Sequence, residues 1–135
     1  MLPSLGTDTE NHMAKERCSV FEYLYRDGGN FKTHGLLRLS GWDDEAEGII
    51  RKCLEWGDQF VAEQVGVPSL CNEHWESVGE GPSDLDHAFH EFVCLRMPQG
   101  DEASLPVWSS LEELVSRMQA AARRWDVRLS PNCDL

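Results

Sequence analysis

A pair of apolar segments around the sequence DGGN constrains the fold of this chain more than any other feature. Residues 18–26, CSVFEYLYR, are rich in aromatic and β-branched side chains, which is typical of a strand. Residues 27–30, DGGN, tolerate the positive φ that a tight hairpin turn requires, and we expect Gly28 or Gly29 to adopt it. Residues 31–39 then form a return strand. The sequence therefore predicts a β-hairpin at this place.

Alternation along the first segment predicts how its side chains divide between the two faces of the strand. One face carries Ser19, Phe21, Tyr23 and Tyr25. The other face carries Val20, Glu22, Leu24 and Arg26. In the return segment, Gly35 indicates a bulge or a close backbone approach.

Helical periodicity is clearest in two places. Ser40 with Asp43 resembles a capping box, and apolar residues then recur at helical spacing until Gly57, which we expect to end the helix. These apolar residues are Ala46, Ile49, Ile50, Cys53 and Leu54. Ser109 with Glu112 begins the last helix in the same way. Its expected buried face consists of Leu111, Leu114, Val115, Met118, Ala122 and Trp125.

Shorter elements complete the pattern. We expect strands over residues 59–65 and 90–97, a short helix over 69–78 and an edge strand over 127–129. A helix that begins near Ser83 is the alternative for the stretch before residue 90. The order of elements predicts an α+β two-layer sandwich, in which a mostly antiparallel sheet of about four strands carries two main helices on one face.

The length of 135 residues suits a single domain. We place this domain at residues 18–129, after a disordered tail over 1–17 and before a frayed C-terminus over 130–135. Met13 is an alternative start to Met1, in which case the residues before it form a non-native leader.

Charge excludes several classes of function. The chain has 24 acidic and 12 basic residues, a net charge of -12 and a pI near 4.7. Such a balance argues against direct binding of nucleic acid and against docking on an anionic membrane. The sequence also contains no run of about 18 apolar residues that would predict a transmembrane helix. The odd number of five cysteines and the lack of a signal-peptide pattern predict reduced thiols and a cytoplasmic protein.

The densest group of potential metal ligands lies between residues 71 and 94. It consists of Cys71, His74, His87, His90 and Cys94. Zinc takes four ligands of these types, often in pairs two or three residues apart, but the order Cys-His-His-His matches no standard zinc module. The alternative is that Cys94 packs in the core, that His74 lies beside Trp75 on a helix, and that the other histidines hydrogen-bond at the surface.

Two charged regions are candidate binding surfaces. Residues 71–102 contain eight acidic residues and one basic residue, Arg96, so they are suited to capture a basic protein surface. The candidate contacts are Glu73, Glu76, Glu80, Asp84, Asp86 and Glu91, and a merely solvated acidic surface is the alternative. At the hairpin turn, Arg26, Lys32 and His34 form a candidate anion site, unless Arg26 pairs with a neighbouring acid.

No nucleophile, phosphate-binding or dinucleotide motif is present in the sequence. The stretches FEYLYRDGGNFKTHG, WGDQFVAEQVGVP and GPSDLDHAFHEF resemble a group of small bacterial proteins to which no function is attached. This resemblance covers most of residues 20–95 and implies no activity, cofactor or site residue.

The sequence predicts a small acidic cytoplasmic interaction module without a cofactor, such as an inhibitor, an immunity protein or an antitoxin-like regulator. The alternative is a zinc-binding protein or metal-dependent enzyme that uses the Cys71–Cys94 cluster.

Overall fold

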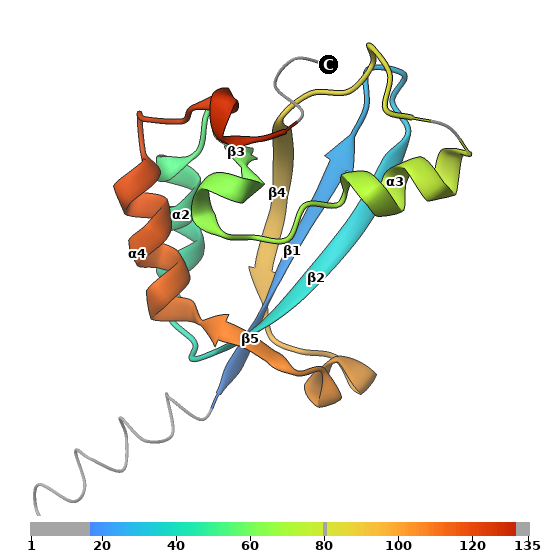
Figure 1. Cartoon of the computed structure of the whole chain (residues 1–135). Helices are drawn as coiled ribbons and strands as arrows, with labels where there is room; N and C mark the ends of the chain where they lie inside the picture. The colour runs from blue at the N-terminus through green and yellow to red at the C-terminus, as the bar shows by residue number, and fades with distance from the viewer. Residues whose placement is uncertain (1–16, 80, 132–135) are drawn as a thin grey trace, which may run out of the picture.

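The structure, a computed structural model, describes residues 17–79 and 81–131 (Figure 1). Almost all of the predicted N-terminal tail and residues 132–135 therefore lie outside the described residues. Ser130, which we assigned to the frayed end, is buried, and its backbone nitrogen donates to the carbonyl of Val127. The strands are β1 (Cys18–Arg26), β2 (Lys32–Ser40), β3 (Gln59–Val61), β4 (Phe89–Arg96) and β5 (Val107–Ser110). The α-helices are α2 (Ala46–Cys53), α3 (Cys71–Val78) and α4 (Leu111–Ala121).

The five strands form one strongly curled, mixed sheet in the order β3-β4-β1-β2-β5. The pairs β1–β2, β1–β4 and β3–β4 are antiparallel, whereas β5 runs parallel to β2. The α+β class is thus confirmed, and the described sheet is mostly antiparallel as predicted. It has five strands instead of about four and is curled, and α3 corresponds to the short helix expected over residues 69–78. Strand β5 was not predicted, because its four residues directly precede α4 and resemble the N-terminal cap of that helix. The predicted edge strand at Val127–Leu129 is instead a turn of 3-10 helix.

Phe21, Tyr23 and Tyr25 share one face of β1 as predicted, and on the other face Val20 and Leu24 are also buried. Phe21, Tyr23 and Tyr25 point into the core and are at most 1% exposed. Phe21 lies at ring-centroid distances of 5.8 Å from Phe60 and 5.1 Å from Phe92, which brings β1, β3 and β4 into one aromatic cluster. Helices α2 and α4 lie side by side in Figure 1 and supply aliphatic side chains to the same core. Ile50, Leu114 and Met118 are the fully buried members of this set.

The hairpin joins β1 to β2 as predicted, but the residue with positive φ is Asn30, at 70°, and neither Gly28 nor Gly29. The cause is Asp27, whose Oδ1 accepts hydrogen bonds from the backbone nitrogens of Gly29 and Phe31. This Asx-type turn places the left-handed conformation just before the return strand, and asparagine tolerates it better than most residues.

Gly35 in β2 is required by a close approach of side chains. It pairs with Tyr23 in an unbroken β1–β2 register, so the predicted bulge is absent there. A Cβ atom at Gly35 would lie 2.9 Å from Cε1 of Tyr23 and 2.8 Å from Cδ2 of Leu70. Glycine therefore allows the Tyr23 ring and the segment before α3 to pack directly on the strand.

The helix boundaries differ from prediction at their starts. Ser40 is the last residue of β2, so α2 begins only after Glu45, and it ends before Leu54 instead of at Gly57. Helix α4 begins one residue later than predicted, because Ser110 accepts the capping hydrogen bond from the nitrogen of Glu113. The predicted strand over 59–65 forms only β3 and continues as 3-10 helix over Ala62–Val65. Over the described residues, no helix combines the length and apolar composition needed to cross a membrane.

Candidate functional site

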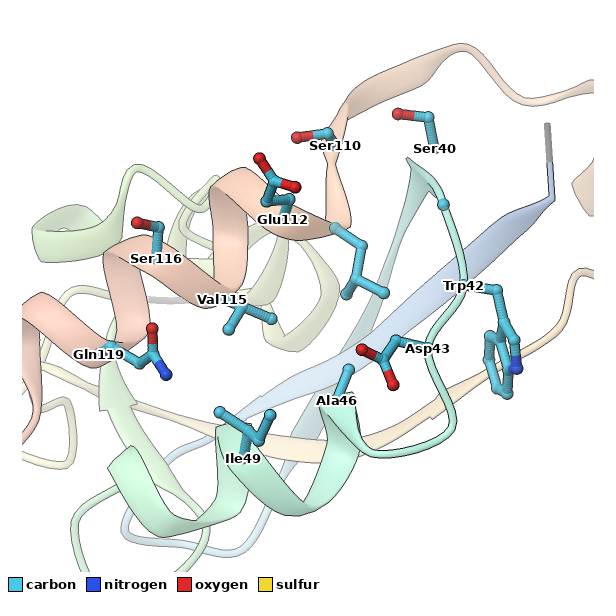
Figure 2. A pocket seen from close by; sticks show the side chains of 12 residues that line it. Ser40, Trp42, Asp43, Ala46, Ile49, Ser110, Glu112, Val115, Ser116 and Gln119 are labelled. Atoms are coloured by element: carbon cyan, nitrogen blue, oxygen red, sulfur yellow. The ribbon is translucent and has the colours of Figure 1, made fainter. Parts of the chain in front are cut away.

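A groove with a volume of about 620 Å³ lies beside the end of β2, between the N-terminal parts of α2 and α4 (Figure 2). This volume falls within the range of roughly 300–1,000 Å³ that is common for ligand sites. The apolar lining residues are Trp42, Ala46, Ile49, Leu111 and Val115. The remaining lining residues are Ser40, Gly41, Asp43, Ser110, Glu112, Ser116 and Gln119. An apolar floor with a polar rim can hold an amphipathic ligand.

Local hydrogen bonds fix the walls of this groove. The chain leaves β2 through Gly41, whose φ of +98° favours glycine. The indole nitrogen of Trp42 then donates to Oδ1 of Asp44 at 2.8 Å, and Oδ1 of Asp43 accepts from the nitrogen of Glu45 at 2.9 Å. On the opposite wall, the Ser110 cap sets the first turn of α4. The groove is therefore formed before any ligand binds.

The electrostatic character of the groove is negative. Asp43 and Glu112 line it, and Asp44 and Glu45 are exposed next to it. Within the described part of the chain, none of these four carboxylates forms an ion pair, and the lining includes no lysine or arginine. The positive ends of the α2 and α4 dipoles offset part of this charge, by roughly half an elementary charge each. The groove thus favours a ligand that combines an apolar group with a cation.

The three histidines of the predicted metal cluster gather around one ring, that of Tyr25. The ring centroids of His74, His87 and His90 lie 4.8, 5.3 and 5.2 Å from the Tyr25 centroid. The three histidines therefore lie close together, but the tyrosine ring lies between them. Among the described residues, no three histidine, cysteine, aspartate or glutamate side chains are placed to hold a metal ion.

Hydrogen bonds to the histidine nitrogens explain this result. In His74, Nε2 lies 2.8 Å from Oδ2 of Asp27 and Nδ1 lies 2.8 Å from the hydroxyl of Thr33. In His87, Nε2 donates to the carbonyl of Arg26, while Nδ1 accepts from the nitrogen of Phe89. Both ring nitrogens of these two histidines are therefore occupied by protein groups that a metal would have to displace.

The other predicted ligands lie in different surroundings. Nε2 of His90 accepts from the nitrogen of Leu70, and burial lowers the pKa of His90 to about 4, so its ring is neutral at pH 7. Cys71 is buried at the start of α3. Cys94 pairs in register with Glu22, on the face of the sheet opposite to Tyr25. Burial raises the pKa of the Cys94 thiol, which disfavours the thiolate that zinc requires.

A buried aspartate completes this network. Asp86 is 5% exposed and accepts hydrogen bonds from the hydroxyl of Tyr25 at 2.5 Å, from the indole of Trp75 at 2.9 Å and from the nitrogen of Ser83 at 2.8 Å. Burial acts to raise its pKa, but these three donors together hold the pKa below its ordinary value. Burial, and then the bond to Asp86, raises the pKa of Tyr25. The network connects β1, α3 and the loop before β4.

The acidic surface predicted over residues 71–102 is smaller than expected. Asp86 cannot contact a partner, since its carboxylate is enclosed as described above. Glu91 forms an ion pair with Arg26 at 2.8 Å, and Glu102 forms one with Arg96. Glu80 lies outside the described residues. The exposed acids that remain on α3 and the following loop are Glu73, Glu76 and Asp84.

The predicted anion site at the hairpin is also altered. Arg26 donates to both Glu91 and Asn30, so its guanidinium is engaged within the chain. Lys32 and His34 are exposed and, within the described residues, form no ion pair. The turn thus exposes basic side chains but does not gather all three around one anion.

Comparisons of the chain with protein-family models, with curated proteins and with solved structures find no match. The site must therefore be interpreted from its own geometry. Sequence reasoning missed the groove because its walls come from two helix starts that are far apart in the chain. The available signal was that both helices begin with acidic residues, Asp43 to Glu45 and Glu112 to Glu113.

Proposed function

We propose that the protein is an interaction module whose α2–α4 groove binds a basic, amphipathic segment of another protein. The observation that carries this proposal is the groove itself, with an apolar floor, Asp43 and Glu112 on its rim, and no basic side chain among its lining residues. The net charge of -12 supports the same choice of partner, because at low ionic strength it attracts basic surfaces. An inhibitor, an immunity protein or an antitoxin-like regulator would act in this way by covering a basic segment of its target.

The two parts of the groove contribute differently to binding. Burial of one large apolar side chain on the floor contributes about 1.5–3 kcal/mol, whereas an exposed ion pair contributes at most about 1 kcal/mol. The floor therefore determines most of the affinity. The carboxylates determine the sign of the partner's charge and make the association depend on salt.

The test uses a fluorescent helical peptide of leucine and lysine, with a leucine–glutamate peptide of the same pattern as its charge control. Fluorescence anisotropy measures binding of each peptide to the full chain at low and moderate salt. Val115→Lys places a cation on the groove floor, whereas Ala120→Lys adds the same charge to an exposed position of α4 outside the groove. We expect Val115→Lys to weaken binding of the lysine peptide at least about tenfold, or 1.4 kcal/mol, and Ala120→Lys to leave it within about twofold.

The expected salt response is weaker binding of the lysine peptide as ionic strength rises, and little binding of the glutamate peptide at any salt. Equal binding of the two peptides would show that the rim does not select charge. Equal binding by the Val115→Lys and Ala120→Lys variants would show that the peptide binds elsewhere. Either result would refute the proposal.

A further inference from the structure

The turn between β1 and β2 presents an apolar side chain beside a base. Phe31 is 63% exposed, and Lys32 follows it at the start of β2. Leu85, from the loop before β4, is 47% exposed and lies against the same turn. A Cβ atom at Gly29 would lie 3.6 Å from Cδ2 of Phe31 and 3.7 Å from Cδ1 of Leu85, so the two side chains flank this glycine. We call Phe31, Lys32 and Leu85 the hairpin tip.

The hairpin tip is held in one conformation. The nitrogen of Asp27 donates to the carbonyl of Phe31, and the nitrogen of Asn30 donates to the carbonyl of Asp27, both at 3.0 Å. The nitrogen of Gly28 donates to the carbonyl of Leu85 at 2.8 Å, which fixes the tip to the neighbouring loop. Because little freedom remains to be lost, an apolar side chain presented here binds with a small entropic cost.

The hairpin tip has the chemistry that the α2–α4 groove favours. Phe31 and Leu85 are apolar, Lys32 is a cation, and the nearby carboxylate of Asp27 is buried against His74. The tip thus places two apolar side chains beside the cation of Lys32, with the exposed acid Asp84 next to Leu85. Trp56, the other highly exposed aromatic residue, lies instead between the acids Glu55 and Asp58 in the chain.

The hairpin tip cannot reach the groove of its own chain. Strand β2 begins at Lys32 in the tip and ends at Ser40, which lines the groove. Eight steps along a strand, at about 3.3 Å each, separate these two residues by roughly 26 Å. In Figure 1 the β1–β2 turn and the start of α4 lie at opposite ends of the sheet. Any contact between tip and groove must therefore join two molecules.

We propose that the hairpin tip of one copy of this chain docks in the α2–α4 groove of a second copy. Phe31 would lie on the part of the floor that Ile49 and Val115 form, and Lys32 would face the carboxylates on the rim. This inference rests on the proposed function of the groove and identifies a second copy as a partner. At a salt concentration of 0.15 M the Debye length is about 8 Å, so the net charges of two copies repel only weakly while this local contact remains.

The contact would be head to tail, since the two surfaces are different and lie at opposite ends of the molecule. Each bound copy retains one free tip or one free groove. Such association continues to larger assemblies unless the geometry closes into a ring. A symmetric dimer, in contrast, would stop at two copies.

Sedimentation velocity at a salt concentration of 0.15 M, over a hundredfold range of protein concentration up to about 0.5 mM, tests this inference. The tip variant is Phe31→Ser and the groove variant is Val115→Lys. Trp56→Ser is the matched control, because it removes another highly exposed aromatic side chain from a different place. We expect the wild type and Trp56→Ser to form larger species as concentration rises, and the tip and groove variants to stay monomeric when each is alone.

The decisive sample is a mixture of the two variants. Phe31→Ser retains a groove and Val115→Lys retains a tip, so together they should form a one-to-one dimer and nothing larger. Lys32→Glu, which reverses one exposed charge, should weaken wild-type association at least about tenfold and serves as a second tip variant if Phe31→Ser fails to fold. A wild type that stays monomeric, or a mixture that forms no dimer, would overturn the inference. If the leucine–lysine peptide still binds in that case, the proposed function stands and only self-association is wrong.

Discussion

Replacing Tyr25 by phenylalanine should destabilise the fold more than the same replacement at Tyr23. Both rings are buried in the core, so the two variants lose the same atom from similar surroundings. The Tyr23 hydroxyl donates one hydrogen bond, to the carbonyl of Pro68 at 2.7 Å. The Tyr25 hydroxyl donates to the carboxylate of Asp86 and also accepts from the nitrogen of His87.

The expected sizes follow from these partners. A neutral hydrogen bond contributes about 0.5–1.5 kcal/mol, and one to a charged group contributes about 1.5–3 kcal/mol. Tyr23→Phe should therefore cost about 1 kcal/mol. Tyr25→Phe removes the donor of a buried carboxylate and the acceptor of a backbone nitrogen, so it should cost about 2–4 kcal/mol.

Acid should reduce the difference between the wild type and Tyr25→Phe. The native pKa of Asp86 is lowered, so its hydrogen bonds contribute fully above the unfolded value of about 3.9. That contribution is lost as the pH falls through the native pKa, because the carboxylate becomes protonated.

Urea unfolding at pH 7 and at lower pH measures these differences in the free energy of unfolding. The comparison requires that the slope of this free energy against urea concentration is the same for the wild type and the variants. If Tyr25→Phe proved no more destabilising than Tyr23→Phe at pH 7, the Asp86 network would not stabilise the fold as argued.

Two further predictions concern the core and the turn. Leu114→Ala and Ile50→Ala, at fully buried positions on α4 and α2, should each lower the free energy of unfolding in urea by about 2–5 kcal/mol. The exposed control Lys52→Ala should change it by no more than about 0.5 kcal/mol. Similar values for all three variants would mean that the buried faces of the helices are wrongly assigned. Asn30→Val should be less stable than Asn30→Gly by about 1–2 kcal/mol, because of the two only glycine adopts the φ of 70° without strain. Both variants lose the hydrogen bond with Arg26, so this loss does not affect the comparison. Equal stabilities would show that residue 30 does not need a left-handed conformation.

The parts of the fold that sequence reasoning predicted are those set by neighbours along the chain. Alternation in residues 18–26 placed Phe21 and Tyr25 on the same face of the strand, but it did not show that Val20 and Leu24 on the other face are buried as well. Spacing likewise located α3 and β4 to within two residues at each end. The position of positive φ was missed because it depends on where the Asp27 side chain accepts its hydrogen bonds. No pattern of residue types contains that geometry.

The candidate site was beyond sequence reasoning for a related reason. Spacing suggested that His74, His87 and His90 belong to one metal cluster, and these histidines do lie around a single ring, that of Tyr25. What it could not show is that Tyr25, Asp27 and Thr33 from the hairpin occupy the same space and use the ring nitrogens. The groove depends on two helix starts brought together by the parallel strand β5, a pairing between distant segments that leaves little trace in the local sequence.

The anchoring of the loop before β4 has a consequence for protein engineering. Residues 81–85 are exposed, and on this basis alone they would be chosen as a place to insert a tag or to open a circularly permuted chain. Yet Leu85 accepts from the hairpin through its carbonyl, and the nitrogen of Ser83 donates to Asp86, which also holds Trp75 and Tyr25. An insertion there would disturb the hydrogen bonds that connect this loop to the β1–β2 turn, to Trp75 of α3 and to Tyr25 of β1. The exposed residues Ala103 and Ser104, which lie outside this network, are the better position for a new sequence or a chain break.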